Sequence, residues 1–63
     1  MREFYKDFYG CSACIRIDRD GSAHLTVRAG GKLVHKKSYN NKRGARIAMG
    51  RLSDGWRLED TWI

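Results

Sequence analysis

The sequence predicts an α+β domain, in which an antiparallel β-meander of three to four strands is followed by one helix and a short tail. Apolar and polar residues alternate over residues 13–18 and 23–28, which is the period of a half-buried strand. The apolar spacing then becomes helical between residues 41 and 52. A chain of 63 residues has room for one domain, so we assign residues 1–63 to a single unit.

The first two strands are expected to form a hairpin around Asp20 and Gly21. A two-residue turn would set Ile17 opposite His24 and mix the apolar and polar faces. A three-residue loop over 19–21 sets Ile17 opposite Ala23 and keeps the faces separate. We therefore predict the longer loop, with Gly21 in a left-handed conformation.

Residues 32–39 are predicted to form the next strand after a turn at 29–31. This strand carries lysine on both faces, which is typical of an edge strand. Asn40 and Asn41 are suitable helix N-caps. The apolar arc of the following helix consists of Ala45, Ala48, Met49 and Leu52. The pattern leaves open whether residues 1–10 form a strand or a helical turn.

The basic residues are concentrated in one part of the chain. The net charge is +6, and residues 21–53 contain no acid. Such a patch attracts phosphate backbones, although it is also compatible with a solvated face that only confers solubility. Tyr39 ends a basic strand and is the preferred candidate for stacking on a base. The candidate nucleic-acid-binding residues are Arg16, Arg28, Lys32, Lys36, Lys37, Tyr39, Lys42, Arg43, Arg46 and Arg51.

The possible metal ligands of the chain are its two cysteines and two histidines. Zinc takes four ligands, and Cys11 and Cys14 have only His24 and His35 as possible partners. The spacing is not that of a known zinc finger. We therefore expect no metal and no cofactor, and interpret the cysteines as two small, partly buried thiols.

Asp18 and Asp20 are the candidate catalytic residues. Two neighbouring carboxylates can hold a divalent metal that activates water against a phosphodiester. An aspartate before a turn glycine more commonly binds local backbone N–H groups, so we regard catalysis as the minority interpretation.

A domain of this size usually needs a staple or a partner subunit, so we expect a homo-oligomer, a dimer or a tetramer. Candidate interface residues are Ile47, Trp56 and Trp62. No apolar run approaches the roughly 20 residues that span a bilayer. The acidic residues near the N-terminus do not fit a signal peptide. We expect a cytoplasmic protein of a bacterial host cell with no membrane partner.

A further observation concerns the segments Phe8–Gly10, Asp20–Gly21, Leu25–Val27, Lys32–Val34, Tyr39 and Arg43–Met49. Together they resemble small proteins carried by bacteriophages and mobile elements of clostridia-like bacteria, some of which are anti-CRISPR or other anti-defence factors. A meander followed by a helix also resembles the single-stranded-DNA-binding fold of the transcriptional coactivator positive cofactor 4, which works as a dimer. This chain departs from that fold in having about ten residues after the helix.

The resemblance implies a DNA-facing sheet that carries Arg16, Arg28, Lys36 and Lys37, and a helix that pairs subunits. The first functional hypothesis is therefore a backbone-directed nucleic-acid-binding protein, for DNA rather than RNA, acting in counter-defence such as CRISPR inhibition. A protein inhibitor that binds a host defence nuclease is the second. A metal-dependent nickase of supercoiled DNA, using Asp18 or Asp20, is the third.

Overall fold

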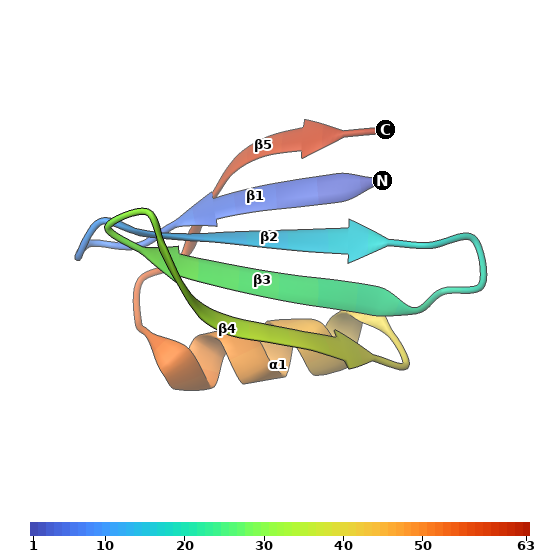
Figure 1. The fold of residues 1–63 in the computed structure, drawn as a ribbon. Coiled ribbons are helices and arrows are strands. Elements are labelled where there is room, and N and C mark those ends of the chain that lie inside the picture. Colours follow the sequence, from blue (N-terminus) through green and yellow to red (C-terminus); the bar gives the residue numbers. More distant parts are fainter.

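The computed structural model describes residues 1–63 as a five-stranded antiparallel sheet with one helix packed on one side (Figure 1). The strand order across the sheet is β4-β3-β2-β1-β5. The predicted α+β meander with a following helix is confirmed, and both ends of the chain add a strand to it. The elements are β1 (Arg2–Lys6), β2 (Cys11–Ile17), β3 (Ala23–Ala29), β4 (Lys32–Tyr39), α1 (Lys42–Leu52) and β5 (Arg57–Trp62).

The β2–β3 hairpin has the predicted register. Ile17 pairs with Ala23 and Ile15 pairs with Leu25, so the apolar faces of the two strands coincide. Gly21 has a φ of +90°, and its N–H donates to the carbonyl of Asp18 at 3.0 Å. A residue with a Cβ rarely adopts such a φ, which explains why glycine ends this turn.

Strand β4 lies at one edge of the sheet, as its mixed pattern indicated. The turn before it has positive φ at both Gly30 and Gly31, as a two-residue type I′ hairpin turn requires. A bulge then places Leu33 opposite Arg28 and His35 opposite Val27. Val34 is the extra residue of this bulge and has no partner in β3. The bulge therefore fixes which residues of β4 share a face with those of β3.

The two ends of the chain pair with each other at the opposite edge. Strand β1 lies between β2 and β5, and its Arg2 pairs with Trp62 of β5. The termini therefore lie side by side at one end of the sheet (Figure 1). Residues 1–10, which the pattern left undecided, thus supply a strand and a turn.

The core lies between α1 and the inner strands. The helix contacts β2, β3 and β4, and its Ala45 and Met49 are buried there. The side chains of Ile15 and Leu25 are fully buried beneath it. Leu52, at the end of the predicted apolar arc, remains 47% exposed. The full set of buried apolar residues is Tyr5, Ala13, Ile15, Ala23, Leu25, Val27, Ala45 and Met49.

The two ends of α1 are held by polar groups. The Asn41 side chain accepts a hydrogen bond from the N–H of Gly44 at 2.8 Å, which confirms the predicted N-cap. At the other end, the indole N–H of Trp56 donates to the carbonyl of Met49 at 2.8 Å. Each bond satisfies one of the backbone groups that a helix terminus leaves unpaired.

A buried carboxylate joins the helix to β1. Glu3 Oε2 lies 2.8 Å from Lys42 Nζ, and Glu3 Oε1 accepts from the hydroxyl of Tyr5 at 2.8 Å. Arg46 donates to the same hydroxyl at 3.0 Å. Burial alone would raise the pKa of Glu3, but the hydrogen bonds and positive charges of this cluster lower it.

A second carboxylate, Asp7, fixes the β1–β2 turn. Its Oδ1 accepts from the backbone N–H groups of Tyr9 and Cys11 at 2.9 and 2.8 Å. Its Oδ2 accepts from the hydroxyl of Ser53, the C-cap residue of α1. Burial acts to raise the pKa of Asp7, and the hydrogen bonds from Ser53, Cys11 and Tyr9 outweigh it, so the pKa is lowered.

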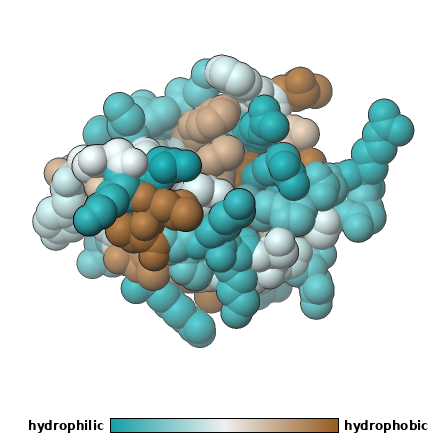
Figure 2. Space-filling model, in the orientation of Figure 1, coloured by the Kyte–Doolittle hydropathy of each residue, from teal (hydrophilic) through white to brown (hydrophobic).

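The surface is mostly hydrophilic, with smaller apolar patches, one of them over the start of β4 (Figure 2). Leu33 and Val34 in that strand are 49% and 58% exposed. No helix has the length and apolar character needed to cross a membrane.

The core assignment predicts unequal effects for two leucines. Leu25→Ala should lower the free energy of unfolding by about 2–5 kcal/mol, because it leaves a cavity under the helix. Leu33→Ala removes the same atoms from an exposed edge position and should change it by about 0.5 kcal/mol or less. Chemical denaturation followed by circular dichroism measures both. Equal losses for the two variants would contradict the described core.

The two carboxylates predict a loss of stability in acid. The folded-state pKa values of Glu3 and Asp7 lie below the ordinary values of 4.5 and 3.8. Their contribution to the free energy of unfolding is therefore fully present above pH 4.5. It is lost as the pH falls through the lowered values, since the unfolded chain then binds more protons. Denaturation midpoints measured between neutral pH and about pH 2 should fall accordingly.

Glu3→Gln should flatten this acid loss, whereas Glu59→Gln, at an exposed position of β5, should leave it as in the wild type. An equally steep pH profile in Glu3→Gln and the wild type would show that the Glu3 cluster does not stabilise the fold.

Candidate nucleic-acid interface

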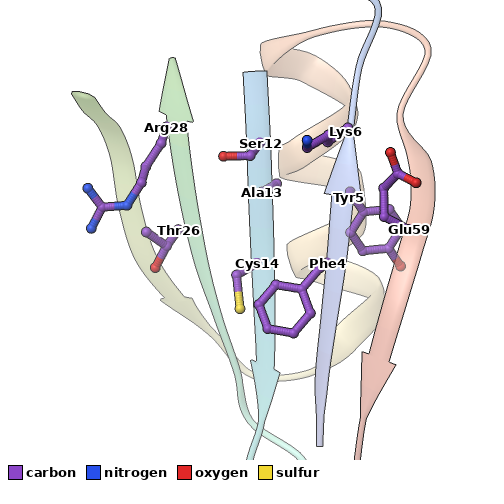
Figure 3. Close-up of a pocket in the computed structure, with 9 residues that line it drawn as sticks. All are labelled: Phe4, Tyr5, Lys6, Ser12, Ala13, Cys14, Thr26, Arg28 and Glu59. Atoms are coloured by element: carbon purple, nitrogen blue, oxygen red, sulfur yellow. The ribbon is translucent and has the colours of Figure 1, made fainter. Parts of the chain in front are cut away.

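The helix covers one side of the sheet, and no element packs on the other side. We call that other side the open face. Successive residues of a strand point to opposite faces, so Ile15 and Leu25 face the helix while Cys14 and Thr26 face outward. Figure 3 shows such outward side chains in front of the sheet, with the helix behind it.

The register arranges the open face into three rows that cross the strands, because directly paired residues lie on the same face. The Arg16 row consists of Arg2, Arg16, His24 and Ser38. The Phe4 row consists of Phe4, Cys14, Thr26 and Lys36. The Arg28 row consists of Lys6, Ser12, Arg28 and Leu33.

The open face is strongly basic. Its cations on β1 to β4 are Arg2, Lys6, Arg16, Arg28 and Lys36. Of these, only Arg16 has a carboxylate within 4.0 Å, namely Asp18 at 3.6 Å. The two side chains of that pair are about half exposed, so the pair adds little stability and leaves Arg16 accessible. Most of the positive charge on this face is therefore unpaired.

A hollow of about 280 Å³ lies in the middle of the open face. The ring of Phe4 lies beside Cys14 at one end of it, and Arg28 on β3 and Lys6 on β1 line it from its two sides (Figure 3). On the side of Phe4 toward β5, the ring of Trp62 makes an edge-to-face contact with the Phe4 ring, with a centroid separation of 5.0 Å. Glu59, the extra residue at the bulge of β5, lines the opposite end.

A second hollow, of about 300 Å³, adjoins the first. It lies along the Arg16 row and is polar, and it shares Cys14 and Thr26 with the first hollow. Arg2, Arg16 and Lys36 line it. The open face thus places an aromatic hollow next to a cationic one.

The predicted nucleic-acid-binding residues do not form one surface. Arg16, Arg28 and Lys36 lie on the open face. The other seven lie on the helix side, at the edge of the sheet or on the helix: Lys32, Lys37, Tyr39, Lys42, Arg43, Arg46 and Arg51. The resemblance to positive cofactor 4 implied that Lys37 lies on the same face as Arg16, Arg28 and Lys36. Lys37 pairs with Leu25, however, and therefore lies on the helix side.

Two of the helix cations are engaged within the chain. Lys42 and Arg46 pair with Glu3, at 2.8 and 3.8 Å. Tyr39, the residue predicted to stack on a base, packs against the core, and His35 Nε2 lies 3.1 Å from its hydroxyl. Arg43 and Arg51 are exposed and have no carboxylate partner.

Sequence reasoning missed the contribution of β1. Arg2, Phe4 and Lys6 alternate with the buried Glu3 and Tyr5. This alternation is the signal that identifies a strand, but a buried glutamate in place of an apolar residue obscures it. Assigning β1 as a strand would have placed two cations and an aromatic ring on the open face.

The candidate catalytic aspartates are held by their neighbours. Asp20 accepts from the backbone N–H and the hydroxyl of Ser22 at 2.9 and 2.7 Å, and these hydrogen bonds lower its pKa. Asp18 Oδ2 lies 2.7 Å from His24 Nε2, and His24 Nδ1 lies 2.7 Å from the Ser38 hydroxyl oxygen. The Asp18–His24–Ser38 chain is exposed and orients His24 within the Arg16 row.

The four possible metal ligands do not come together. In a strand, residues three apart point to opposite faces, so Cys11 lies on the helix side and Cys14 on the open face. His24 shares the open face with Cys14, and His35 lies on the helix side. No group of three or more histidine, cysteine, aspartate or glutamate side chains is arranged to hold a metal ion.

The three interface candidates lie in different places. Ile47 is 49% exposed on the outer side of the helix, and Trp56 packs against the core of its own chain. Trp62 is exposed on the open face, where its indole N–H donates to Asp60 Oδ2 at 2.7 Å. The expected homo-oligomer stays a prediction.

Comparison with known proteins gave no match. No protein-family model, curated protein or solved structure matches this chain. The resemblances to phage and mobile-element proteins and to positive cofactor 4 therefore stay predictions.

The placement of the cysteines predicts their oxidation chemistry. Along β2 the Cα atoms of Cys11 and Cys14 are about 10 Å apart, whereas a disulfide needs less than about 7 Å. Mild oxidation of the folded protein, followed by alkylation under denaturing conditions and mass spectrometry, should therefore find both thiols alkylated in the monomer. A monomer that has lost both thiols to an internal disulfide would show that β2 is not a continuous strand.

Proposed function

We propose that the open face binds single-stranded nucleic acid, chiefly through backbone phosphates. The observation that carries this proposal is the group of five cations on β1 to β4 of an uncovered sheet face, of which only Arg16 has an acidic partner. Bringing phosphates to unpaired cations releases condensed counterions, which supplies most of the affinity of backbone-directed binding. DNA is the first ligand to test, because the sequence resemblance points to it.

The shape of the face supports a single strand over a duplex. Sequence reading in duplex DNA uses an element that enters the major groove, such as a helix or a two-stranded ribbon. Here the helix covers the opposite side of the sheet, and the open face carries the half-buried ring of Phe4 and the exposed ring of Trp62 beside its cations. A sheet face that combines aromatic and cationic side chains suits single-stranded nucleic acid, whose unpaired bases are free to stack.

The two alternative functions have less support. A protein inhibitor would need an acidic surface on its target, and the same cations would meet it. A nickase would use Asp18 or Asp20, but both are bound to neighbouring side chains and belong to no group that could hold a metal. A role in counter-defence is compatible with binding and follows from the resemblance alone.

The proposal predicts steep salt dependence. If all five cations contact phosphates, the slope of log K against log salt concentration should be about −3.5 for a single strand, since each contact contributes about −0.7. Fluorescence anisotropy with a labelled single-stranded DNA oligonucleotide, at several salt concentrations, measures this slope. An RNA oligonucleotide of the same sequence compares the two nucleic acids. A flat response would contradict the proposal.

A pair of matched charge reversals tests the location. Arg28→Glu, on the open face, should weaken binding by about tenfold or more and make the slope shallower by about 0.7. Arg43→Glu makes the same change of charge on the exposed side of the helix and should weaken binding by no more than about threefold, since its effect is screened by salt. Equal losses for the two variants would show that net charge, and not the open face, determines binding.

A further inference from the structure

We propose that the hollow beside Phe4 holds one unpaired base of the bound strand, while the Arg16 row and the Arg28 row hold the phosphates on either side of it. This inference rests on the proposed function and adds to it a site for a base and the path of the bound nucleic acid across the sheet. It replaces Tyr39, which lies on the helix side, with Phe4 as the stacking residue.

The centre of the open face differs chemically from its flanks. Between β1 and β3 the Phe4 row contains a phenyl ring, a thiol and a threonine, and its only cation is Lys36 on the edge strand. The Trp62 ring contacts Phe4 edge to face, which restricts how the Phe4 ring can turn. A base has a flat apolar face, so this neutral centre suits a base and not a phosphate.

The flanking rows have the opposite character. The Arg16 row supplies Arg2 and Arg16 on one side, and the Arg28 row supplies Lys6 and Arg28 on the other. Each row lies two residues along the strands from the Phe4 row, a distance of about 6.7 Å. Phosphates that meet both rows therefore pass on either side of the central hollow, so the bound strand runs along β2 and β3 and not across them.

The size and the acids of the hollow restrict the ligand further. A volume of about 280 Å³ is at the lower limit for small-molecule sites, which suits a single base. Glu59 and Asp60 lie on β5, beyond Phe4. Arg57 is the one cation of β5, so the strand keeps a net negative charge that repels phosphates from that edge. The bound nucleic acid is therefore expected to lie on the β2 and β3 side of Phe4.

The experiment compares two oligonucleotides of equal length and charge, one carrying bases and one abasic. The wild type should bind the base-bearing strand about 5- to 150-fold more tightly, the range expected for one stacked base. Phe4→Leu should remove most of this preference while leaving the affinity for the abasic strand unchanged. Phe4→Tyr should restore the preference, and Phe8→Leu, at an exposed aromatic residue in the β1–β2 turn, should not affect it.

The outcomes separate the two proposals. Salt-dependent binding of both oligonucleotides with equal affinity would overturn the base site and leave the proposed function standing. No binding of either oligonucleotide at low salt would overturn both. If Phe4→Leu weakened the binding of the two oligonucleotides alike, Phe4 would act through the fold and not by stacking, which would also overturn the base site.

Cys14 provides a second readout that needs no change at Phe4. In the variant Cys11→Ser, Cys14 is the only thiol, and it lines the hollow. The base-bearing oligonucleotide, at ten times its Kd, should slow alkylation of Cys14 by iodoacetamide roughly tenfold, because only free protein reacts. At the same multiple of its own Kd, the abasic oligonucleotide should slow it less. Equal protection by the two would contradict a base in the hollow.

Discussion

A sheet has two faces, and a single 11-residue helix covers only one of them. The rest of the structure depends on this constraint. The alternation of β2 and β3 sends the apolar residues toward the helix, and the residues between them must then face solvent. Because those intervening residues are arginine, histidine, threonine, serine and cysteine, the same alternation that builds the core also builds the basic open face.

Two buried carboxylates, Glu3 and Asp7, connect the helix to the rest of the chain. Glu3 is buried at the helix side of β1 and pairs with Lys42 and Arg46, so these cations contribute to packing. Asp7 joins the β1–β2 turn to the end of the helix. Neither carboxylate faces the open side, where the cations remain unpaired except for Arg16. These two carboxylates thus hold the helix in place and leave the basic residues of the opposite face free to bind anions.

Much of this fold follows from local patterns in the sequence. The registers of β2 and β3, the N-cap at Asn41 and the buried positions Ala45 and Met49 agree with the pattern, because each depends on neighbours within a few residues. The pairing of β1 with β5 depends on contacts between the two ends of the chain, which no local period encodes. The buried Glu3 hid the strand character of β1, since its partners Lys42 and Arg46 come from a distant helix.

The candidate site was predictable only in part, because its composition is visible in the sequence but its arrangement depends on distant strand pairings. The excess of basic residues in residues 21–53 was visible, but a charge count does not say which side chains share a face. The alternation in β4 is interrupted by the bulge near Val34, so Lys36 and Lys37 were not separable without the pairing to β3. Phe4 and Trp62, which are 58 residues apart in sequence, come together only because β1 and β5 are neighbours.

The central claim is that the side of the sheet opposite the helix is the binding surface. Nuclear magnetic resonance measures this most directly, by following backbone amide and side-chain signals of the labelled protein during titration with a single-stranded oligonucleotide. We expect the largest shifts at Phe4, Cys14, Thr26 and Arg28, and small shifts along Lys42–Leu52. Shifts concentrated on the helix, with the open face unchanged, would contradict the account.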